Sequence, residues 1–316
     1  MYSAAQLRRG LGRSIEWPGY AGRELNRLYH RRGYRRDHNA EGVDIPSEDW
    51  DNLVVLDACR YDLFVDRNTL PGVLEARQSK GSHTVEFLHA NFGGRELHDT
   101  VYVTATPQFH RHRKALNAAF HATVDVWHEG GWDDDAGTVR PETMTRYAKE
   151  AAAAFPDKRL LIHYLQPHYP FLTADGTLGA DRLSDGKGSD IWARLARGTA
   201  EVSADTVRDA YAANLDAALP HVAEFLETVD GRSVVTADHG NMLGERARPV
   251  PIREWGHPPG VYTPELVQVP WLVQAADQRR EVVSEPPSAA QEAPKGDEEE
   301  VDDAVTERLE QLGYRA

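Results

Sequence analysis

The chain has 316 residues, a single cysteine (Cys59) and a net charge of −14, from 50 acidic and 36 basic residues. One cysteine excludes an internal disulfide, and the acidic balance disfavours wholesale binding to nucleic acid. No stretch reaches the roughly 18 apolar residues that span a bilayer, and no secretory signal opens the chain, so we expect a soluble cytoplasmic protein. Only six of the basic residues are lysines, and an acidic, lysine-poor composition is typical of a halophilic protein.

Residues 1–47 are expected to form an arginine-rich N-terminal extension. Nine arginines and hardly any acid occur in residues 1–38. Leu25, Leu28 and Tyr29 recur at helical spacing, which predicts a surface helix packed on the main domain. The alternative is that this basic segment contacts an acidic partner or, peripherally, an anionic membrane surface.

From about residue 48, apolar runs alternate with amphipathic stretches. This pattern is typical of an α/β domain with a mostly parallel central sheet between helices, here expected over residues 48–274. The expected strands are 52–57, 99–104, 123–127, 159–165, 232–237 and 268–273. The expected helices are 61–67, 84–92, 111–120, 141–154 and 204–229.

Two later segments have the composition of connecting chain. Residues 173–189 are rich in Gly, Asp and Ser, which predicts a loop insertion. Residues 275–302 are acidic and contain too few apolar side chains to bury a core, which predicts a disordered linker. The chain then ends in a short amphipathic helix at 303–316, for which we expect docking back on the domain.

Two of the apolar runs end in acidic residues. Asp57 follows the run Asn52–Leu56, and Asp238-His239-Gly240 follows Ser233–Ala237. In open α/β sheets, ligands gather beyond the carboxyl ends of the strands, so both carboxylates and His239 are candidates for one metal site. The alternative is that Asp238 caps the next helix and that His239 is a satisfied core histidine.

A polar turn, Gly81-Ser82-His83-Thr84, leads into the helix expected at 84–92. A hydroxyl at a helix N-terminus faces backbone N–H groups and the positive end of the helix dipole, which favour an anion or an alkoxide. Thr84 or Ser82 is therefore a candidate nucleophile. The alternative is a simple N-cap.

Three histidines lie near strand ends or in rigid turns. His163 lies inside an expected strand, His168 follows it in a Pro-His-Tyr-Pro loop, and His257 lies in a Gly-His-Pro-Pro turn. Imidazoles at the rim of a sheet can bind a second metal or contact a charged oxygen of a substrate. His163 is also consistent with a core histidine.

Together these segments resemble the alkaline phosphatase superfamily, in its sulfatase-like branch, over roughly residues 50–275. The resemblance rests on the order of the motifs as well as on the residues. The matching positions are Asp57, Thr84 with Gly94 ten residues later, Pro167–Pro170, Asp238–Gly240, and His257 ahead of Val269-Pro270. The spacing to Gly94 favours Thr84 over Ser82 as the nucleophile. Because the Cys/Ser-x-Pro-x-Arg signature of formylglycine sulfatases is missing there, the resemblance implies phosphoric rather than sulfuric esters.

The resemblance implies a metal-dependent ester hydrolase with a covalent intermediate on Thr84. The alternatives are a phosphotransferase that modifies a surface glycan or lipid carrier, and a non-catalytic sulfatase-like binding module. The substrate would be a small-molecule, glycan or lipid phosphoester, and the cofactor one or two divalent cations, Mn²⁺, Zn²⁺, Mg²⁺ or Ca²⁺. The implied residues are Asp57, Thr84, Asp238 and His239 at the metal, His168 and His257 in catalysis, and His163, Arg60 and His168 at the substrate.

Overall fold

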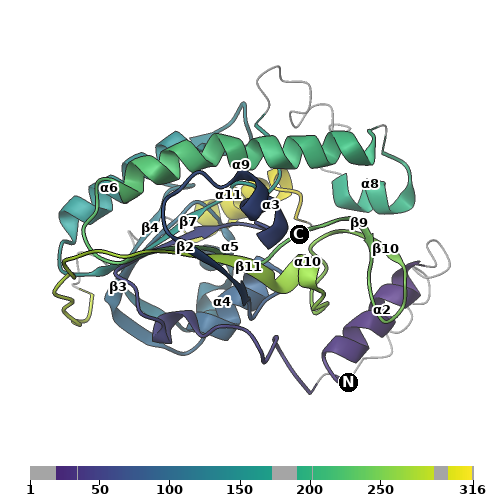
Figure 1. Ribbon diagram of the computed structural model, residues 1–316, viewed down its shortest axis with the longest axis horizontal. Helices are drawn as coiled ribbons and strands as arrows, with labels where there is room; N and C mark the ends of the chain where they lie inside the picture. Colours follow the sequence, from purple (N-terminus) through teal and green to yellow (C-terminus); the bar gives the residue numbers. More distant parts are fainter. Residues whose placement is uncertain (1–18, 34, 173–190, 201, 288–297, 315–316) are drawn as a thin grey trace.

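The computed structural model describes residues 19–33, 35–172, 191–200, 202–287 and 298–314 (Figure 1). Its centre is a seven-stranded sheet in the order β2-β11-β8-β1-β7-β3-β4. The strands are β1 Asn52–Leu56, β2 Val73–Gln78, β3 Glu96–Thr104, β4 Ala119–Asp125, β7 Arg159–Tyr164, β8 Ser233–Ala237 and β11 Gln268–Gln274. Neighbouring strands from β8 to β4 are parallel, whereas β11 is antiparallel to both of its neighbours. The expected mostly parallel α/β fold is confirmed.

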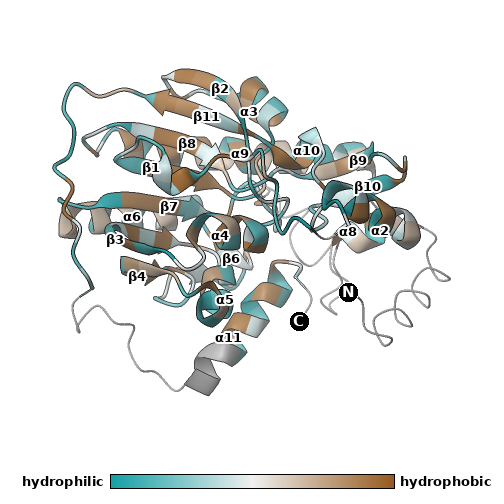
Figure 2. Cartoon of the chain, turned by 90° about the horizontal axis from the view of Figure 1, so that it is seen from below, coloured by the Kyte–Doolittle hydropathy of each residue, from teal (hydrophilic) through white to brown (hydrophobic). Residues whose placement is uncertain are grey.

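Helices cover both faces of the sheet (Figure 1). They are α2 Gly19–His30, α3 Tyr61–Arg67, α4 Thr84–Phe92, α5 Gln108–Leu116, α6 Pro141–Ala154, α8 Ile191–Arg197, α9 Ala204–Leu226, α10 Pro264–Val267 and α11 Glu298–Gln311, with a 3-10 turn at Ile45–Ser47. Side chains alternate along a strand, so Val54 and Leu56 of β1 join the apolar cluster of α6 and α9, whereas Leu53 and Val55 join that of α4. Burial on both faces explains why the central strands β1, β7 and β8 are largely apolar in the sequence, and Figure 2 shows brown, hydrophobic segments within the sheet.

Most differences from the expected elements lie at the edges of the fold. Edge strand β2 was not expected, because its side chains are mostly exposed and polar. Two small hairpins were also not expected, β5 Trp132–Asp133 with β6 Thr138–Val139, and β9 Met242–Arg246 with β10 Arg253–Gly256. The helix expected at 111–120 ends at Leu116, because Asn117 adopts a left-handed φ of +47° and β4 begins two residues later.

Both terminal helices dock on the domain. In α2, Arg23 pairs with buried Glu254 of β10, and the Asn26 amide donates to the Val250 carbonyl at 2.9 Å. Val305 and Leu309 of α11 and Leu312 just after it are almost fully buried in the main apolar cluster, and the helix lies against α5 (Figure 2). The N-terminal extension before residue 19 and the loop expected at 173–189 lie outside the described residues.

Residues 275–287, the described part of the expected linker, contain no helix or strand, yet ion pairs and hydrogen bonds hold them against the domain. Arg279 pairs with Asp49 and Asp51, and Glu285 pairs with Lys158 at 2.8 Å. The low apolar content of this segment is consistent with its lack of helix and strand. It did not predict the ion pairs that Arg279 and Glu285 form with the domain. Within the described ranges, no helix is long and apolar enough to cross a membrane.

Candidate metal centre and active site

Asp57 and Asp238 emerge side by side at the carboxyl end of the sheet. They directly follow Leu56 of β1 and Ala237 of β8, which are register partners in adjacent parallel strands. Asp57, Asp238 and His239 are all fully buried. One ligand atom of each lies within 4.8 Å of the others. The structure thus brings three residues with metal-ligating side chains to one point.

The hydrogen bonds of the two carboxylates leave room for a cation. Asp238 Oδ1 accepts the backbone N–H groups of Ala58 at 3.0 Å and His239 at 2.8 Å, which fixes this carboxylate. Asp238 Oδ2 and both oxygens of Asp57 accept no hydrogen bond from the residues that the structure describes. Buried carboxylate oxygens without donors are costly, and a divalent cation is the ligand that would satisfy them.

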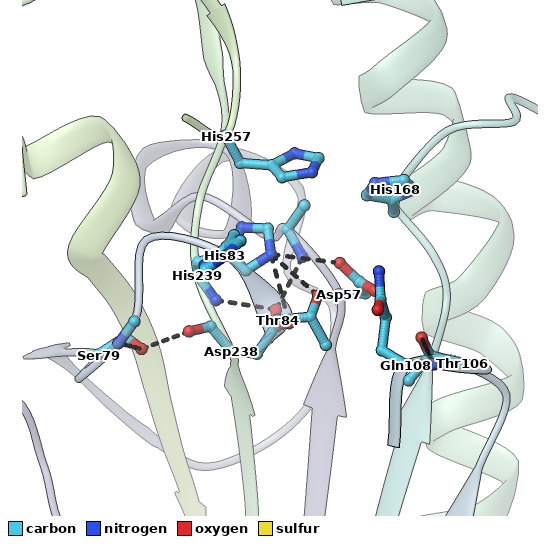
Figure 3. A network of polar contacts seen from close by, with 12 residues as sticks. Asp57, Ser79, His83, Thr84, Thr106, Gln108, His168, Asp238, His239 and His257 are labelled. Atoms are coloured by element: carbon cyan, nitrogen blue, oxygen red, sulfur yellow. Dashed lines mark hydrogen bonds and ion pairs between the residues drawn. The ribbon is translucent and has the colours of Figure 1, made fainter. Parts of the chain in front are cut away.

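His239 is oriented as a neutral metal ligand (Figure 3). Its Nδ1–H donates to the Gly240 carbonyl at 2.7 Å, so the lone pair is on Nε2. Nε2 lies 3.4 Å from Asp238 Oδ2, 3.6 Å from Asp57 Oδ1 and 3.3 Å from Thr84 Oγ1. Burial lowers the pKa of His239 to about 3, so the ring is neutral near pH 7. A hydrogen bond from the second ring nitrogen to a carbonyl is typical of metal-bound histidine.

The two carboxylates repel one another unless a positive charge lies between them. Burial, and then the charge of Asp238, raise the pKa of Asp57 well above its usual value. Burial also raises the pKa of Asp238. A bound divalent cation would favour the ionised form of both groups, so the side chains present fit a metal ion.

Of the two candidate nucleophiles, Thr84 faces this centre. Thr84 is the first residue of α4, and its hydroxyl lies 3.3 Å from His239 Nε2. The Ser82 hydroxyl instead donates to Glu86 Oε2 at 2.9 Å and accepts the Gly260 N–H at 2.8 Å. Both hydroxyls are buried, but Ser82 is held by Glu86 and Gly260 whereas the Thr84 hydroxyl lies beside His239.

His168 and His257 lie above the metal-ligating residues in Figure 3. Their ring centroids are 5.0 Å apart, and His257 is 4.8 Å from His239. Burial lowers the pKa of His168 to about 4 and that of His257 well below its usual value. The Nδ1 atom of each contacts a protein oxygen, from Tyr169 in one case and Asn241 in the other. With Nδ1–H donating there, each ring presents an Nε2 lone pair.

The two other residues expected at the substrate contact the protein itself. Arg60 donates to the carboxylates of Asp62 and Glu245, so its guanidinium is already neutralised. His163 is buried inside β7, with its Nδ1 2.8 Å from the Tyr102 hydroxyl and its Nε2 3.8 Å from Asp238 Oδ2. The structure therefore places Arg60 in an ion-pair network and His163 beside Asp238, and their expected substrate contacts stay a prediction.

Gly240 allows the close approach that this site requires. A Cβ atom there would lie 2.2 Å from the backbone oxygen of Glu265. We expect Gly240→Ala to lower the free energy of unfolding by about 1–3 kcal/mol and to weaken metal binding, because the adjacent His239 must shift. Denaturant unfolding and metal titration measure both effects. In the control Gly94→Ala, the new methyl meets open space and only the φ of +68° is strained, so a loss of metal affinity there would contradict this explanation.

A cavity of about 260 Å³ adjoins the histidine side of the site. Among the described residues that line it are His83, His257, Trp192, Trp255, Arg23 and Tyr314, and none is acidic. Sequence reasoning assigned no role to His83 or Tyr314. His83 could have been found from its place beside Thr84, whereas Tyr314 lies far beyond the last motif and no pattern singled it out.

No protein-family model matches the chain, and no curated protein matches it significantly. Among solved structures, it is similar to the C-terminal periplasmic domain of the phosphoethanolamine transferase EptC from Campylobacter jejuni (13% identity, 72% of this chain and 78% of that chain, TM-score 0.45). A phosphonate monoester hydrolase from Silicibacter pomeroyi is 14% identical over 83% and 72% of the two chains, with a TM-score of 0.39. A protein from Vibrio parahaemolyticus is 12% identical over 81% and 70%, also with a TM-score of 0.39. It is described as a member of the alkaline phosphatase superfamily, the superfamily that this sequence resembles.

Proposed function

We propose that this protein is a metal-dependent hydrolase of phosphoric esters, of the alkaline phosphatase type, that acts through Thr84. One observation carries the proposal. Four polar groups lie close together at the carboxyl end of the sheet. They are the carboxylates of Asp57 and Asp238, which have oxygens without hydrogen-bond donors, the neutral imidazole of His239, and the Thr84 hydroxyl at the N-terminus of α4. A cation held by Asp57, Asp238 and His239 would lower the pKa of the Thr84 hydroxyl and neutralise charge on the transferring group.

In the first step, Thr84 Oγ1 attacks phosphorus and gives up its proton as the bond to the alcohol oxygen breaks, and the alcohol leaves with that proton. The product is a phosphothreonine at residue 84. In the second step, water attacks the same phosphorus and Thr84 Oγ1 leaves, which releases phosphate. His257 presents an Nε2 lone pair on this side, which suits accepting the proton of the attacking water or binding a second cation, whereas His168 Nε2 lies 3.3 Å from the Tyr314 hydroxyl.

The surroundings of the site support an anionic substrate. The protein carries a net charge of −14, yet the cavity beside Thr84 has no acidic residue among its described lining, which includes Arg23, Arg197 and two histidines. Arg23 is paired with Glu254, but none of the described lining residues is acidic, so an anion meets less repulsion here than elsewhere on this acidic protein. The missing formylglycine signature supports phosphoric over sulfuric esters.

A metal-supplemented activity screen tests this proposal. We expect the full chain at high salt to hydrolyse 4-nitrophenyl phosphate or bis(4-nitrophenyl) phosphate only after Mn²⁺, Zn²⁺, Mg²⁺ or Ca²⁺ is restored to chelator-treated protein. Equilibrium dialysis is expected to show one or two bound cations. Turnover of 4-nitrophenyl sulfate alone would contradict phosphoryl chemistry. If adding an alcohol raises turnover and phosphate appears on that alcohol, the protein is a phosphotransferase. If the protein binds metal but turns over none of the esters, it is a binding module.

A further inference from the structure

The cavity next to the site has walls from parts of the chain that the metal-binding motifs do not include. Helix α2 supplies Arg23, α8 supplies Trp192, and the C-terminal segment supplies Tyr314. His83 and His257 line the end of the cavity nearest the metal-ligating residues, because His83 precedes Thr84 and His257 lies beside His239. A group bound in the cavity therefore lies next to His83, the residue before Thr84, and next to His257, whose ring is 4.8 Å from that of His239.

Two tryptophans form rigid, flat parts of the wall. Trp192 is 7% exposed and packs edge-on against Phe171, with ring centroids 6.3 Å apart. It also lies so close to the backbone of Gly256 that a Cβ there would be 2.8 Å from its Cγ atom. Trp255, also 7% exposed, packs on Gly244 in the same way. Side chains fixed by such packing offer ring faces that need no ordering when a ligand binds.

The C-terminal tail positions Tyr314 through a specific helix end. The Tyr314 N–H donates to the Leu309 carbonyl at 2.8 Å and the Gly313 N–H to the Glu310 carbonyl at 3.0 Å, with Gly313 at a φ of +84°. These are the two hydrogen bonds of a Schellman motif, and buried Leu309 and Leu312 anchor it to the core. Tyr314 is thereby held at the site by the fold.

The Tyr314 ring stacks on the ring of His168, with centroids 5.4 Å apart and planes 8° apart. Its hydroxyl lies 3.3 Å from His168 Nε2, so it can donate to that lone pair. The ring is also 5.8 Å from His257. Tyr314 thus forms the wall where the cavity meets the catalytic histidines.

We infer that this cavity binds the alcohol portion of the ester and selects alcohols that contain a ring with an apolar face, with Trp192 and Tyr314 as the specificity-determining residues. The inference rests on the proposed function. Aromatic walls favour flat apolar groups, which bury area against them and stack. A volume of about 260 Å³ is below the roughly 300 Å³ at which pockets for drug-sized ligands begin, so it suits one ring.

Calorimetric binding of unreactive phosphonates tests the inference without relying on turnover. The ligands are ethylphosphonate, benzylphosphonate and a glucosyl phosphonate, titrated into the full chain supplied with Mn²⁺. We expect at least one ring ligand to bind about tenfold more tightly than ethylphosphonate, and the two ring ligands distinguish an aryl from a sugar alcohol. In Trp192→Ala and Tyr314→Ala the preference for the ring ligands over ethylphosphonate is expected to fall to about twofold. Tyr314→Phe is expected to keep the preference, because it keeps the ring.

The matched control is Tyr29→Ala, which removes a tyrosine that is 64% exposed on α2 and does not line this cavity. It is expected to leave all three affinities unchanged. The protein could turn over phosphoric esters and yet bind the ring ligands and ethylphosphonate with equal affinity. This result would overturn the ring preference and leave the proposed function standing. Failure of every phosphonate and of inorganic phosphate to bind would contradict both. Faster turnover in Tyr314→Ala with an unchanged ring preference would also overturn the inference, because Tyr314 would then block the site rather than shape it.

Discussion

Thr84→Ala is expected to lower turnover of phosphoric esters by at least about 10³-fold. The substitution removes the hydroxyl that lies 3.3 Å from His239 Nε2, and without it no covalent intermediate can form. Alanine is the best helix former, so α4 is expected to keep its first turn. Asp57, Asp238 and His239 remain, so metal content by equilibrium dialysis and the circular dichroism spectrum are expected to match those of the unmodified chain.

Ser82→Ala is the matched control, since it removes a buried hydroxyl two residues away. Its hydrogen bonds with Glu86 and Gly260 are lost, at a cost of about 1–3 kcal/mol in the free energy of unfolding. Turnover is expected to persist. Thr84→Ser keeps a hydroxyl at the same backbone position and is expected to recover part of the activity. Activity that survives Thr84→Ala and disappears in Ser82→Ala would mean that Ser82 is the nucleophile.

The candidate metal-binding residues could be picked out from the sequence because a strand end is recognised from its local pattern of apolar and acidic residues. An apolar run that ends in an acid predicts a buried strand with a carboxylate at its carboxyl end, and parallel strands present these ends along one edge. What the sequence pattern could not supply is which strands are neighbours. Asp57 and Asp238 meet because β1 and β8 are adjacent, and this adjacency depends on the long-range order of the sheet.

The choice between Ser82 and Thr84 shows a second limit. Both residues lie in the turn that opens α4, where a hydroxyl is a good N-cap as well as a good nucleophile. Sequence spacing alone cannot say which side chain points to the strand ends, and only the resemblance favoured Thr84. The structure adds the physical reason, because Glu86 and Gly260 bind the Ser82 hydroxyl.

Arg60 and Tyr314 show which contacts the local pattern could not predict. An arginine just beyond a metal-ligating aspartate suggests an anion site, yet its carboxylate partner Glu245 comes from the unexpected hairpin of β9 and β10. Tyr314 reaches the site only because α11 docks through Val305, Leu309 and Leu312. Both outcomes depend on tertiary contacts between segments far apart in the sequence, for which the local pattern carries no signal.

Asp57→Asn is expected to abolish metal binding while stabilising the metal-free protein at neutral pH. Burial and the charge of Asp238 raise the pKa of Asp57 above the 3.8 of an unperturbed carboxyl. At a pH between 3.8, the pKa in the unfolded chain, and the raised pKa in the folded chain, Asp57 is protonated only in the folded chain. The contribution of Asp57 to stability therefore declines as the pH rises through this range. Asparagine is neutral at every pH. Relative to the unmodified chain, the variant is therefore expected to gain less stability at pH 5 than at pH 8, where the gain is roughly 1–3 kcal/mol.

Denaturant unfolding at both pH values, with chelator and then with saturating Mn²⁺, measures these effects. Metal at 100 times its dissociation constant adds about 2.7 kcal/mol to a protein that binds it only when folded, so Mn²⁺ is expected to stabilise the unmodified chain and not the variant. This gain should grow with pH, because binding requires both carboxylates to be ionised. Asp66→Asn, at an exposed position of α3, is the control and is expected to respond to Mn²⁺ like the unmodified chain. Without metal at pH 8, the repulsion between the Asp57 and Asp238 carboxylates predicts that Asp57→Asn is more stable than the unmodified chain. A variant that is less stable than the unmodified chain would contradict this and would show that Asp57 supports the fold.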